Sequence, residues 1–192
     1  MTQKKKNNDT IICFEECTKS VFVPLDNIKT VPFEISDKDI RNLLSFFLYR
    51  SPGVESIHSK IIKREKHQEI YDEMFRERHF VYKKICSSNT IIDKELQKGH
   101  VEGNKICLKC KRFVLKREKT QKGHNPETDL DCILRHIRNS IAHGRVYYRK
   151  DRNRIHFVFE DCNKKNLTAR IVCIKSDLEF WKKVLSRKEN YE

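Results

Sequence analysis

The clearest element of the sequence is the stretch Asn125-Pro-Glu-Thr-Asp-Leu-Asp-Cys-Ile-Leu-Arg-His-Ile-Arg-Asn-Ser-Ile-Ala-His-Gly144. Its apolar residues recur at steps of three and four, which is the spacing of one helix face: Leu130, Ile133, Leu134, Ile137 and Ile141. Asn125 can cap the start of a helix, with Pro126 at the first helical position. Gly144 suits the position just past a helix C-terminus. We predict a helix over 126–142 with one buried face.

Two helices are predicted before this one. Ser36 can cap a helix of about 36–50, which Ser51-Pro52-Gly53 would end. A longer helical pattern covers about 54–85. The polar stretch 63–67 lies between its two halves, so the pattern fits either one long helix or two shorter ones.

A β-hairpin and a last helix are predicted after it. The segments 155–159 and 167–174 alternate as strands do, on either side of a polar turn, which predicts a hairpin over 155–174. Ser176 and Glu179 have the spacing of a capping box, which opens a terminal helix.

The remaining segments carry weaker signals. Residues 1–9 are polar and basic and are predicted to form a flexible arm, and 10–24 suggest one or two short strands. Residues 86–124 are predicted to be an irregular insertion with a short helix near 91–96. A length of 192 residues fits a single domain, here 10–192. The expected fold is mostly α, a helical bundle with a small appended hairpin.

Charge points to a polyanionic partner. Lys and Arg total 41 and Asp and Glu total 27, a net charge of +14, which favours nucleic acid first. An anionic membrane surface is the second candidate, but no apolar run approaches the roughly 20 residues of a membrane span. No signal-type segment follows the N-terminus, so we expect a cytoplasmic protein with mainly reduced cysteines.

The end of the predicted helix 126–142 combines two groups that suit RNA cleavage. Arg138 lies at the boundary of the apolar face, and His143 lies at or just past the helix end. Arginine can hold a phosphate through its planar fork of donors, and histidine exchanges protons near neutral pH. Attack by a ribose 2′-hydroxyl needs a base, an acid and charge stabilisation at phosphorus, but no metal. Both residues also suit ordinary roles, as a boundary arginine and as a histidine favoured by the helix dipole.

The segment Arg138-Asn-Ser-Ile-Ala-His143, followed by Gly144, resembles the R-x(4–6)-H motif of the HEPN superfamily, with the Ala-His-Gly ending typical of its defence and toxin–antitoxin branches. The resemblance covers about 130–148 closely. It implies a HEPN-type helical bundle that is usually a homodimer with a composite active site, and a metal-independent endoribonuclease without cofactors. Arg138 and His143 would be the catalytic pair, with Asn139 orienting them. An antitoxin or activator protein is an implied partner. The alternative is a non-catalytic HEPN module that binds nucleic acid or a protein.

Basic and aromatic residues flank the motif. Cations and two adjacent tyrosines suit an RNA backbone and its unpaired bases. The predicted RNA-binding residues are Arg135, Arg145, Tyr147, Tyr148, Arg149, Lys150 and Arg152. A solvated entrance to the hairpin is the alternative interpretation of this charge run.

Cys107 and Cys110 have the spacing of half a zinc site, although a second pair with the same spacing is missing. They are weak metal candidates, and thiols in a loop or at a core edge are the simpler interpretation. A zinc site with four ligands would need two further residues, which long loops would have to bring to this pair. The candidates are His100, His124, Cys86 and Cys132. Cys13 and Cys17 lie beside apolar residues and are expected to pack.

Overall fold

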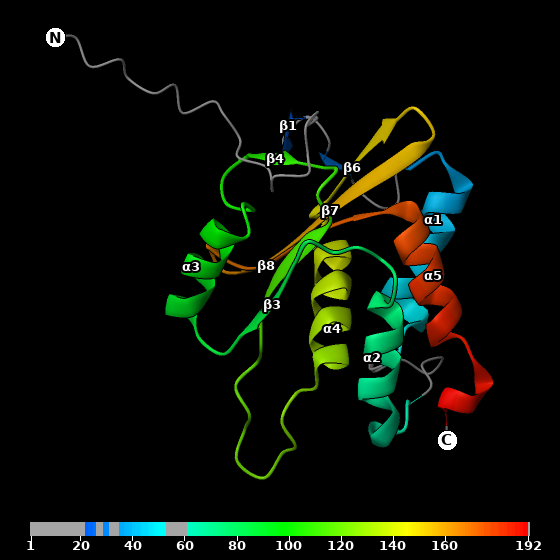
Figure 1. The fold of residues 1–192 in the computed structure, drawn as a ribbon. Helices are drawn as coiled ribbons and strands as arrows, with labels where there is room; N and C mark the ends of the chain where they lie inside the picture. The colour runs from blue at the N-terminus through cyan, green and yellow to red at the C-terminus, as the bar shows by residue number, and fades with distance from the viewer. Residues whose placement is uncertain (1–21, 26–28, 31–34, 53–60, 192) are drawn as a thin grey trace, which may run out of the picture.

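A mixed β-sheet is the centre of the protein. The structure, a computed structural model, describes residues 22–25, 29–30, 35–52 and 61–191 (Figure 1). Six strands lie in the order β2-β6-β7-β8-β5-β3. Their bounds are β2 (Lys29–Thr30), β6 (Val146–Asp151), β7 (Arg154–Asn163), β8 (Asn166–Ile174), β5 (Arg112–Lys116) and β3 (Tyr82–Cys86). β3 pairs with β5 in parallel, and the other neighbours are antiparallel.

The sheet corrects the expectation of a mostly α bundle, because the fold is α/β. The predicted hairpin 155–174 is present as β7 and β8, but these strands lie in the middle of the sheet instead of being appended to a bundle. Core clusters on both faces of the sheet bury these strands, and Val158 and Val172 are fully inaccessible.

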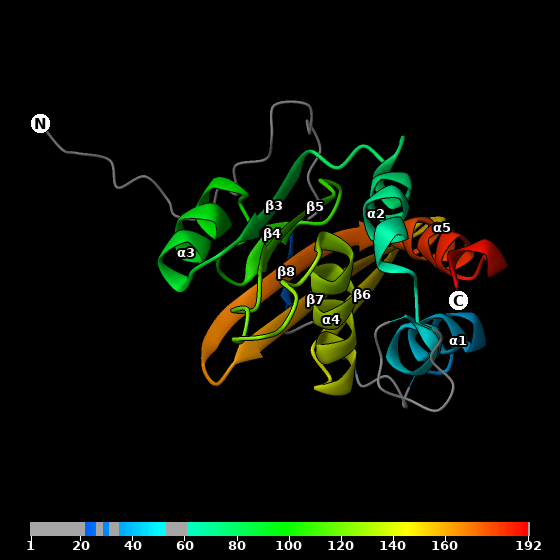
Figure 2. The ribbon, with the colours of Figure 1, turned by 90° about the horizontal axis from the view of Figure 1, so that it is seen from below.

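Helices cover both faces of the sheet (Figure 2). Four of them pack on one face, in a large core cluster with Trp181, Phe113 and Phe157: α1 (Lys38–Ser45), α2 (His67–Phe75), α4 (Asp129–Ala142) and α5 (Lys175–Leu185). The other face carries α3 (Asn89–Lys98) in a smaller cluster with Val114 and Val158. Beside α3, a two-stranded sheet pairs β1 (Phe22–Pro24) with β4 (Lys105–Cys107).

The helix predicted over 36–50 is confirmed in place. Asp37, and not Ser36, caps α1, since its carboxylate accepts hydrogen bonds from the amides of Asp39 and Ile40. The last five residues, Phe46–Arg50, form the π-helical segment η3.

The helical pattern predicted over 54–85, as one helix or two, is confirmed only as α2, and its last part is wrong. Residues 53–60 lie outside the described residues, and a 3₁₀ turn, η4 (Arg64–Lys66), precedes α2. The helix ends at Phe75, and Glu77 and His79 then take left-handed φ values of 58° and 51°, which no continuing helix allows. The end of the predicted helix is instead the strand β3.

Residues 86–124, predicted to be irregular, contain α3, β4 and β5. The short helix expected at 91–96 is confirmed within α3. The predicted arm 1–9 and most of the predicted strands of 10–24 lie outside the described residues; β1 is the part that can be described. A final 3₁₀ turn, η5 (Lys188–Asn190), follows α5.

Candidate active site at the end of helix α4

Helix α4 carries the motif identified in the sequence. Its start differs from the prediction: Thr128, not Asn125, is the N-cap, and Thr128 and Asp131 form a capping box. Its apolar face is buried as predicted, with Ile133 and Ile137 fully inaccessible. Gly144 takes a φ of 63° just past the helix end, which suits glycine at this position.

The opposite side of α4 faces a pocket. Residues four apart on a helix lie on one side, so Arg135, Asn139 and the terminal His143 share a direction. The pocket has a volume of about 420 Å³ and is open to solvent. Its lining comes from α4, from the ends of β7 and β8 with the turn between them, and from the end of β5 with the chain after it: Lys116, Arg117, Glu118, Lys119, Arg135, His136, Asn139, His143, Asp161, Cys162, Asn163, Lys164 and Thr168.

Asp161 organises the floor of this pocket. One of its carboxylate oxygens accepts hydrogen bonds from Asn139 Nδ2 (3.1 Å) and from His136 Nδ1 (2.7 Å). His136 Nε2 lies 2.7 Å from the carbonyl oxygen of Lys116. Burial by itself raises the pKa of Asp161, but the hydrogen bonds from His136 and Asn139 outweigh it and hold the pKa below its usual value. The Asn139 amide is therefore fixed by a buried carboxylate.

His143 is one of the exposed residues that line the pocket. It is the C-cap residue of α4, and its backbone amide donates to the carbonyl of Asn139 at 2.9 Å. Its side chain is exposed, so substrate can approach it. The pocket thus combines an anchored amide with an accessible imidazole, which suits proton exchange with a bound ligand.

Arg138 does not line this pocket. Successive helix positions are separated by about 100° around the axis, so Arg138 leaves α4 on a neighbouring side to Asn139 and is half-buried there. Of the three residues predicted to act together, a single chain brings Asn139 and His143 into one hollow and places Arg138 beside it.

The predicted RNA-binding residues divide into two groups. Arg135 pairs with Glu127 at 2.6 Å and Arg145 donates to Cys162 Sγ at 2.8 Å, so both are held inside the molecule's own contacts. Tyr147 is only 8% exposed and packs in the smaller core cluster, which removes its ring from base stacking and corrects that expectation. Tyr148 is half-buried and packs against the main core, 6.1 Å from the ring of Phe157.

The other group, Arg149, Lys150 and Arg152, is exposed at the tip of the β6–β7 hairpin. This basic tip lies at the far end of β7 from the pocket. Arg154 and Asp161 are seven residues apart along that strand, or about 23 Å at the usual rise. An RNA strand that contacts both would have to follow the length of the hairpin.

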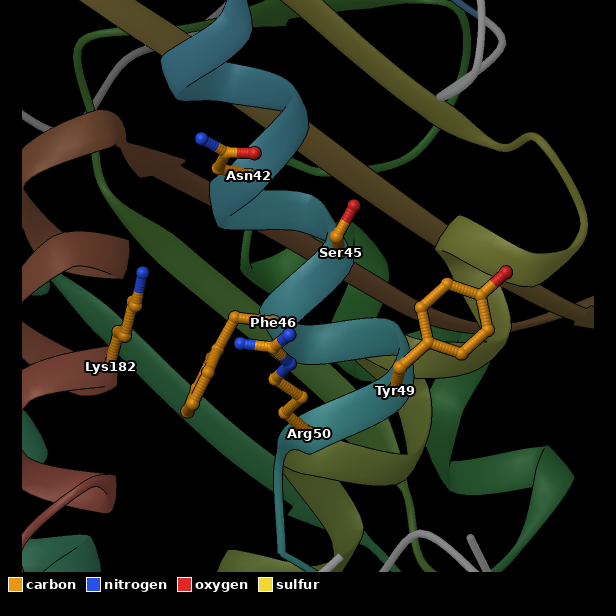
Figure 3. A pocket seen from close by; sticks show the side chains of 6 residues that line it. All are labelled: Asn42, Ser45, Phe46, Tyr49, Arg50 and Lys182. Carbon is orange, nitrogen blue, oxygen red and sulfur yellow. The ribbon is translucent and has the colours of Figure 1, made fainter. Parts of the chain in front are cut away.

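A second hollow, of about 530 Å³, lies between α1 and η3 on one side and α5 on the other (Figure 3). Arg50 and Lys182 supply cations there, and Lys182 Nζ lies 5.6 Å from the centre of the Phe46 ring. Its lining residues include neither a histidine nor a carboxylate, so it has no pair of groups for acid–base chemistry at neutral pH. It contains none of the predicted site residues, and the α4 pocket is the better candidate.

Asp161 and Lys116 are pocket residues that the sequence does not reveal. Asp161 is 22 residues from Asn139 along the chain, and the Lys116 backbone is 20 residues from His136. No spacing rule connects such positions, since the pairing of β7 and β8 brings Asp161 to the helix. The sequence does give a signal at His136. This histidine lies between Ile133 and Ile137 on the predicted buried face, and a buried histidine needs a polar partner such as Asp161.

Cys107 and Cys110, the weak metal candidates, lie close together with their sulfur atoms 3.8 Å apart. Of the residues proposed to complete a site, Cys132 lies elsewhere, with its sulfur 3.7 Å from the Lys116 carbonyl oxygen. Within the described part of the chain, no three histidine, cysteine or acidic side chains are placed to share a metal.

Comparison with known protein families gives a match over nearly the whole chain. The sequence model of the family described as HEPN pEK499 p136 matches residues 1–188. No curated protein and no solved structure matches the chain significantly. Over the described residues, no helix is long and apolar enough to cross a membrane.

Proposed function

Because the chain belongs to the HEPN pEK499 p136 family, we propose that it is a metal-independent endoribonuclease whose site is the pocket at the end of α4. The HEPN superfamily includes ribonucleases, and this membership supports a ribonuclease in general terms. The observation that carries the proposal is the pocket itself, where an exposed His143 lies beside an Asn139 fixed by Asp161. The proposed setting is defence or a toxin–antitoxin pair in the cytoplasm, with an antitoxin or activator protein as the restraining partner.

The reaction is a transesterification within the RNA. The 2′-oxygen loses its proton to a base and bonds to phosphorus, while the bond from phosphorus to the 5′-oxygen of the next nucleotide breaks. That leaving oxygen receives a proton, so the products are a 2′,3′-cyclic phosphate and a 5′-hydroxyl. His143 carries protons in this scheme, Arg138 neutralises the phosphate, and Asn139 orients the reacting groups.

A homodimer would complete the site. One chain supplies one His143, whereas the reaction needs both a base and an acid, and its Arg138 lies outside the pocket. A two-fold axis beside the end of α4 would supply two copies of each residue to one composite cleft. The dimer is therefore part of the proposal, because the cleft is incomplete without the second chain.

We expect the dimer to be required for cleavage. Sedimentation equilibrium should give a dimer at working concentration, and activity per chain should fall on dilution through the dissociation constant. A monomer at concentrations where RNA is cut would contradict the composite site.

The basic tip is proposed to bind the RNA backbone away from the cleavage point. Replacing Arg149, Lys150 and Arg152 with Ala should weaken binding and reduce the slope of log affinity against log salt by about 2, since each phosphate contact on a single strand contributes about 0.7. Fluorescence anisotropy with a single-stranded RNA across a salt series measures this.

The matched control removes three exposed lysines elsewhere: Lys94, Lys183 and Lys188. This control variant loses the same three positive charges as the tip variant. Because these lysines lie away from the basic tip, its slope of log affinity against log salt should equal that of the wild type. If the tip variant and the wild type have equal slopes, the basic tip does not bind the RNA backbone.

The function is tested by mixing the protein with RNA and with DNA of the same sequence. Cutting of RNA alone supports the ribonuclease. The position of Arg138 outside the pocket favours one alternative, a non-catalytic module that binds RNA or a protein partner. If a folded dimer binds RNA tightly but does not cut it, the protein is an RNA-binding module. If it neither binds nor cuts RNA, the protein is a module that binds a protein partner.

A further inference from the structure

The hollow between the α1–η3 helix and α5 carries positive charge from both of its sides. Arg50 comes from η3, and Lys182 comes from α5 on the other side of the hollow (Figure 3). Within the described part of the chain, neither side chain forms an ion pair with a carboxylate, and no acidic residue is among the described residues that line the hollow. Two cations without a counter-charge in one concave surface favour an anionic ligand.

Aromatic rings line the same hollow. The ring of Phe46 is next to Lys182, whose Nζ lies 5.6 Å from the ring centre. Three residues further along the helix, Tyr49 also lines the hollow and is 50% exposed. Exposed rings beside cations are the combination with which proteins bind unpaired bases and the phosphates between them.

The backbone departs from a regular α-helix where these residues lie. The amide of Ser51 donates to the carbonyl oxygen of Phe46 at 2.8 Å, a hydrogen bond across five residues that marks the π-helical turn η3. Such turns are rare and frequently occur at functional sites. Phe46, Tyr49 and Arg50 all belong to this turn, so the irregular backbone coincides with the rings and one cation of the hollow.

The size and the polar groups of the hollow indicate a ligand larger than a free anion. Its volume of about 530 Å³ lies within the range of about 300 to 1,000 Å³ of sites for small organic molecules. The exposed side chains of Asn42 and Ser45, on α1, also line it. An amide and a hydroxyl each donate and accept hydrogen bonds. This suits the edge of a nucleobase, which does both, better than an acidic side chain of a protein partner, whose carboxylate only accepts.

We propose that this hollow binds a nucleotide of the single-stranded RNA substrate, away from the linkage that is cut. A base stacks on the ring of Tyr49, while Arg50 and Lys182 bind the adjacent phosphates. One wall of the hollow, η3, also packs against α4, so the bound strand lies next to the helix that carries the motif. This inference rests on the proposed ribonuclease function, but it is tested by binding, without cleavage.

The test is the affinity for a single-stranded RNA with 2′-O-methyl groups on its riboses, which lacks the attacking hydroxyl and stays intact. Replacing Arg50 and Lys182 together with Ala should weaken binding about tenfold and lower the slope of log affinity against log salt by about 1.4, since two phosphate contacts on a single strand contribute about 0.7 each. The matched control, Lys94→Ala with Lys188→Ala, removes two exposed lysines outside the hollow and should keep the wild-type slope.

The stacking contact is tested separately at Tyr49. Tyr49→Ala should weaken binding roughly tenfold, within the range for the loss of one stacked base. The salt slope should not change, because no charge is removed. Tyr49→Phe keeps the ring and should bind RNA as the wild type does.

A measurement on the wild type covers variants that fail to fold. Irradiation of its complex with the same RNA carrying 5-iodouridine should join a base to Tyr49, which peptide mass spectrometry identifies. Wild-type RNA affinity of the folded Arg50/Lys182 and Tyr49→Ala variants, or crosslinks confined to other segments, would overturn the proposal. A weaker dimer with unchanged RNA affinity would also overturn it, in favour of a second copy of the chain in the hollow. If the expected binding effects appear but unmodified RNA stays intact, the ribonuclease proposal fails and the hollow remains an RNA-binding site.

Discussion

The substitution His143→Ala should reduce RNA cleavage by about a thousandfold, within the range of 10² to 10⁴ that a proton-transfer group contributes. The side chain is exposed at the end of α4 and lines the pocket, so its removal takes away the proton carrier without disturbing the core. His143→Gln should be equally inactive, because glutamine keeps the size and polarity but exchanges no proton. Initial rates with a labelled RNA, at saturating protein, measure the loss.

The matched control is His79→Asn. His79 is also exposed, but it lies between α2 and β3, and asparagine tolerates its left-handed φ of 51°. This variant should keep the wild-type rate. A His143→Ala protein that is folded, dimeric and as active as the wild type would remove this residue from the mechanism.

The second large effect is expected at Asp161. The substitution Asp161→Ala should lower the free energy of unfolding by about 3 kcal/mol, because it leaves His136 buried without its carboxylate partner. It also releases the amide of Asn139, and misplacement of an orienting group should cost between about ten- and a hundredfold in cleavage rate. Urea unfolding and the cleavage assay measure the two effects separately.

The stability contributed by Asp161 has a defined pH dependence. The folded-state pKa of this carboxyl is lowered, since the hydrogen bonds from His136 and Asn139 outweigh the effect of burial. Such a group stabilises the fold fully above its usual pKa of about 3.9. The contribution is lost as pH falls through the lower folded value. The difference in unfolding free energy between wild type and Asp161→Ala should therefore be constant near neutrality and shrink below about pH 4.

Asp93→Ala is the control for this series, because Asp93 is exposed on α3. It should unfold as the wild type does at every pH. If Asp161→Ala has wild-type stability near neutral pH, the contact with His136 does not stabilise the protein.

Sequence periodicity predicted the elements with long apolar patterns, one helix that buries a single face and two strands that are buried on both faces. Helix α4 was predictable from its regular apolar spacing, and the hairpin β7–β8 from two long apolar segments on either side of a polar turn. The other strands gave weak or misleading patterns. All of Arg112–Leu115 in β5 is buried, so the strand does not alternate, and β6 carries charges after its first three residues. At β3, the spacing of Ile85 and of Val81, which directly precedes the strand, fits a helix as well as a strand. Because these strands were not predicted, the hairpin was expected to be an appendage, whereas it lies at the centre of the sheet.

The candidate site was predictable only along one helix. Asn139 and His143 are four residues apart, so helix geometry places them together. The strand β7 brings Asp161 next to Asn139, and the position of β7 beside α4 depends on the pairing of the whole sheet. No local sequence pattern predicts that pairing. Tyr147 illustrates the reverse error: beside basic residues it resembled a base-stacking group, but strand alternation sends its ring into the smaller core.

The most direct measurement of the central claim is the chemistry of the RNA ends that the folded dimer leaves without added divalent metal. We predict a 2′,3′-cyclic phosphate, which resists a phosphomonoesterase until acid opens the ring, paired with a 5′-hydroxyl, and no such fragments from the His143→Ala protein. Fragments with 3′-hydroxyl and 5′-phosphate ends, or intact RNA after incubation with the folded dimer, would contradict the account.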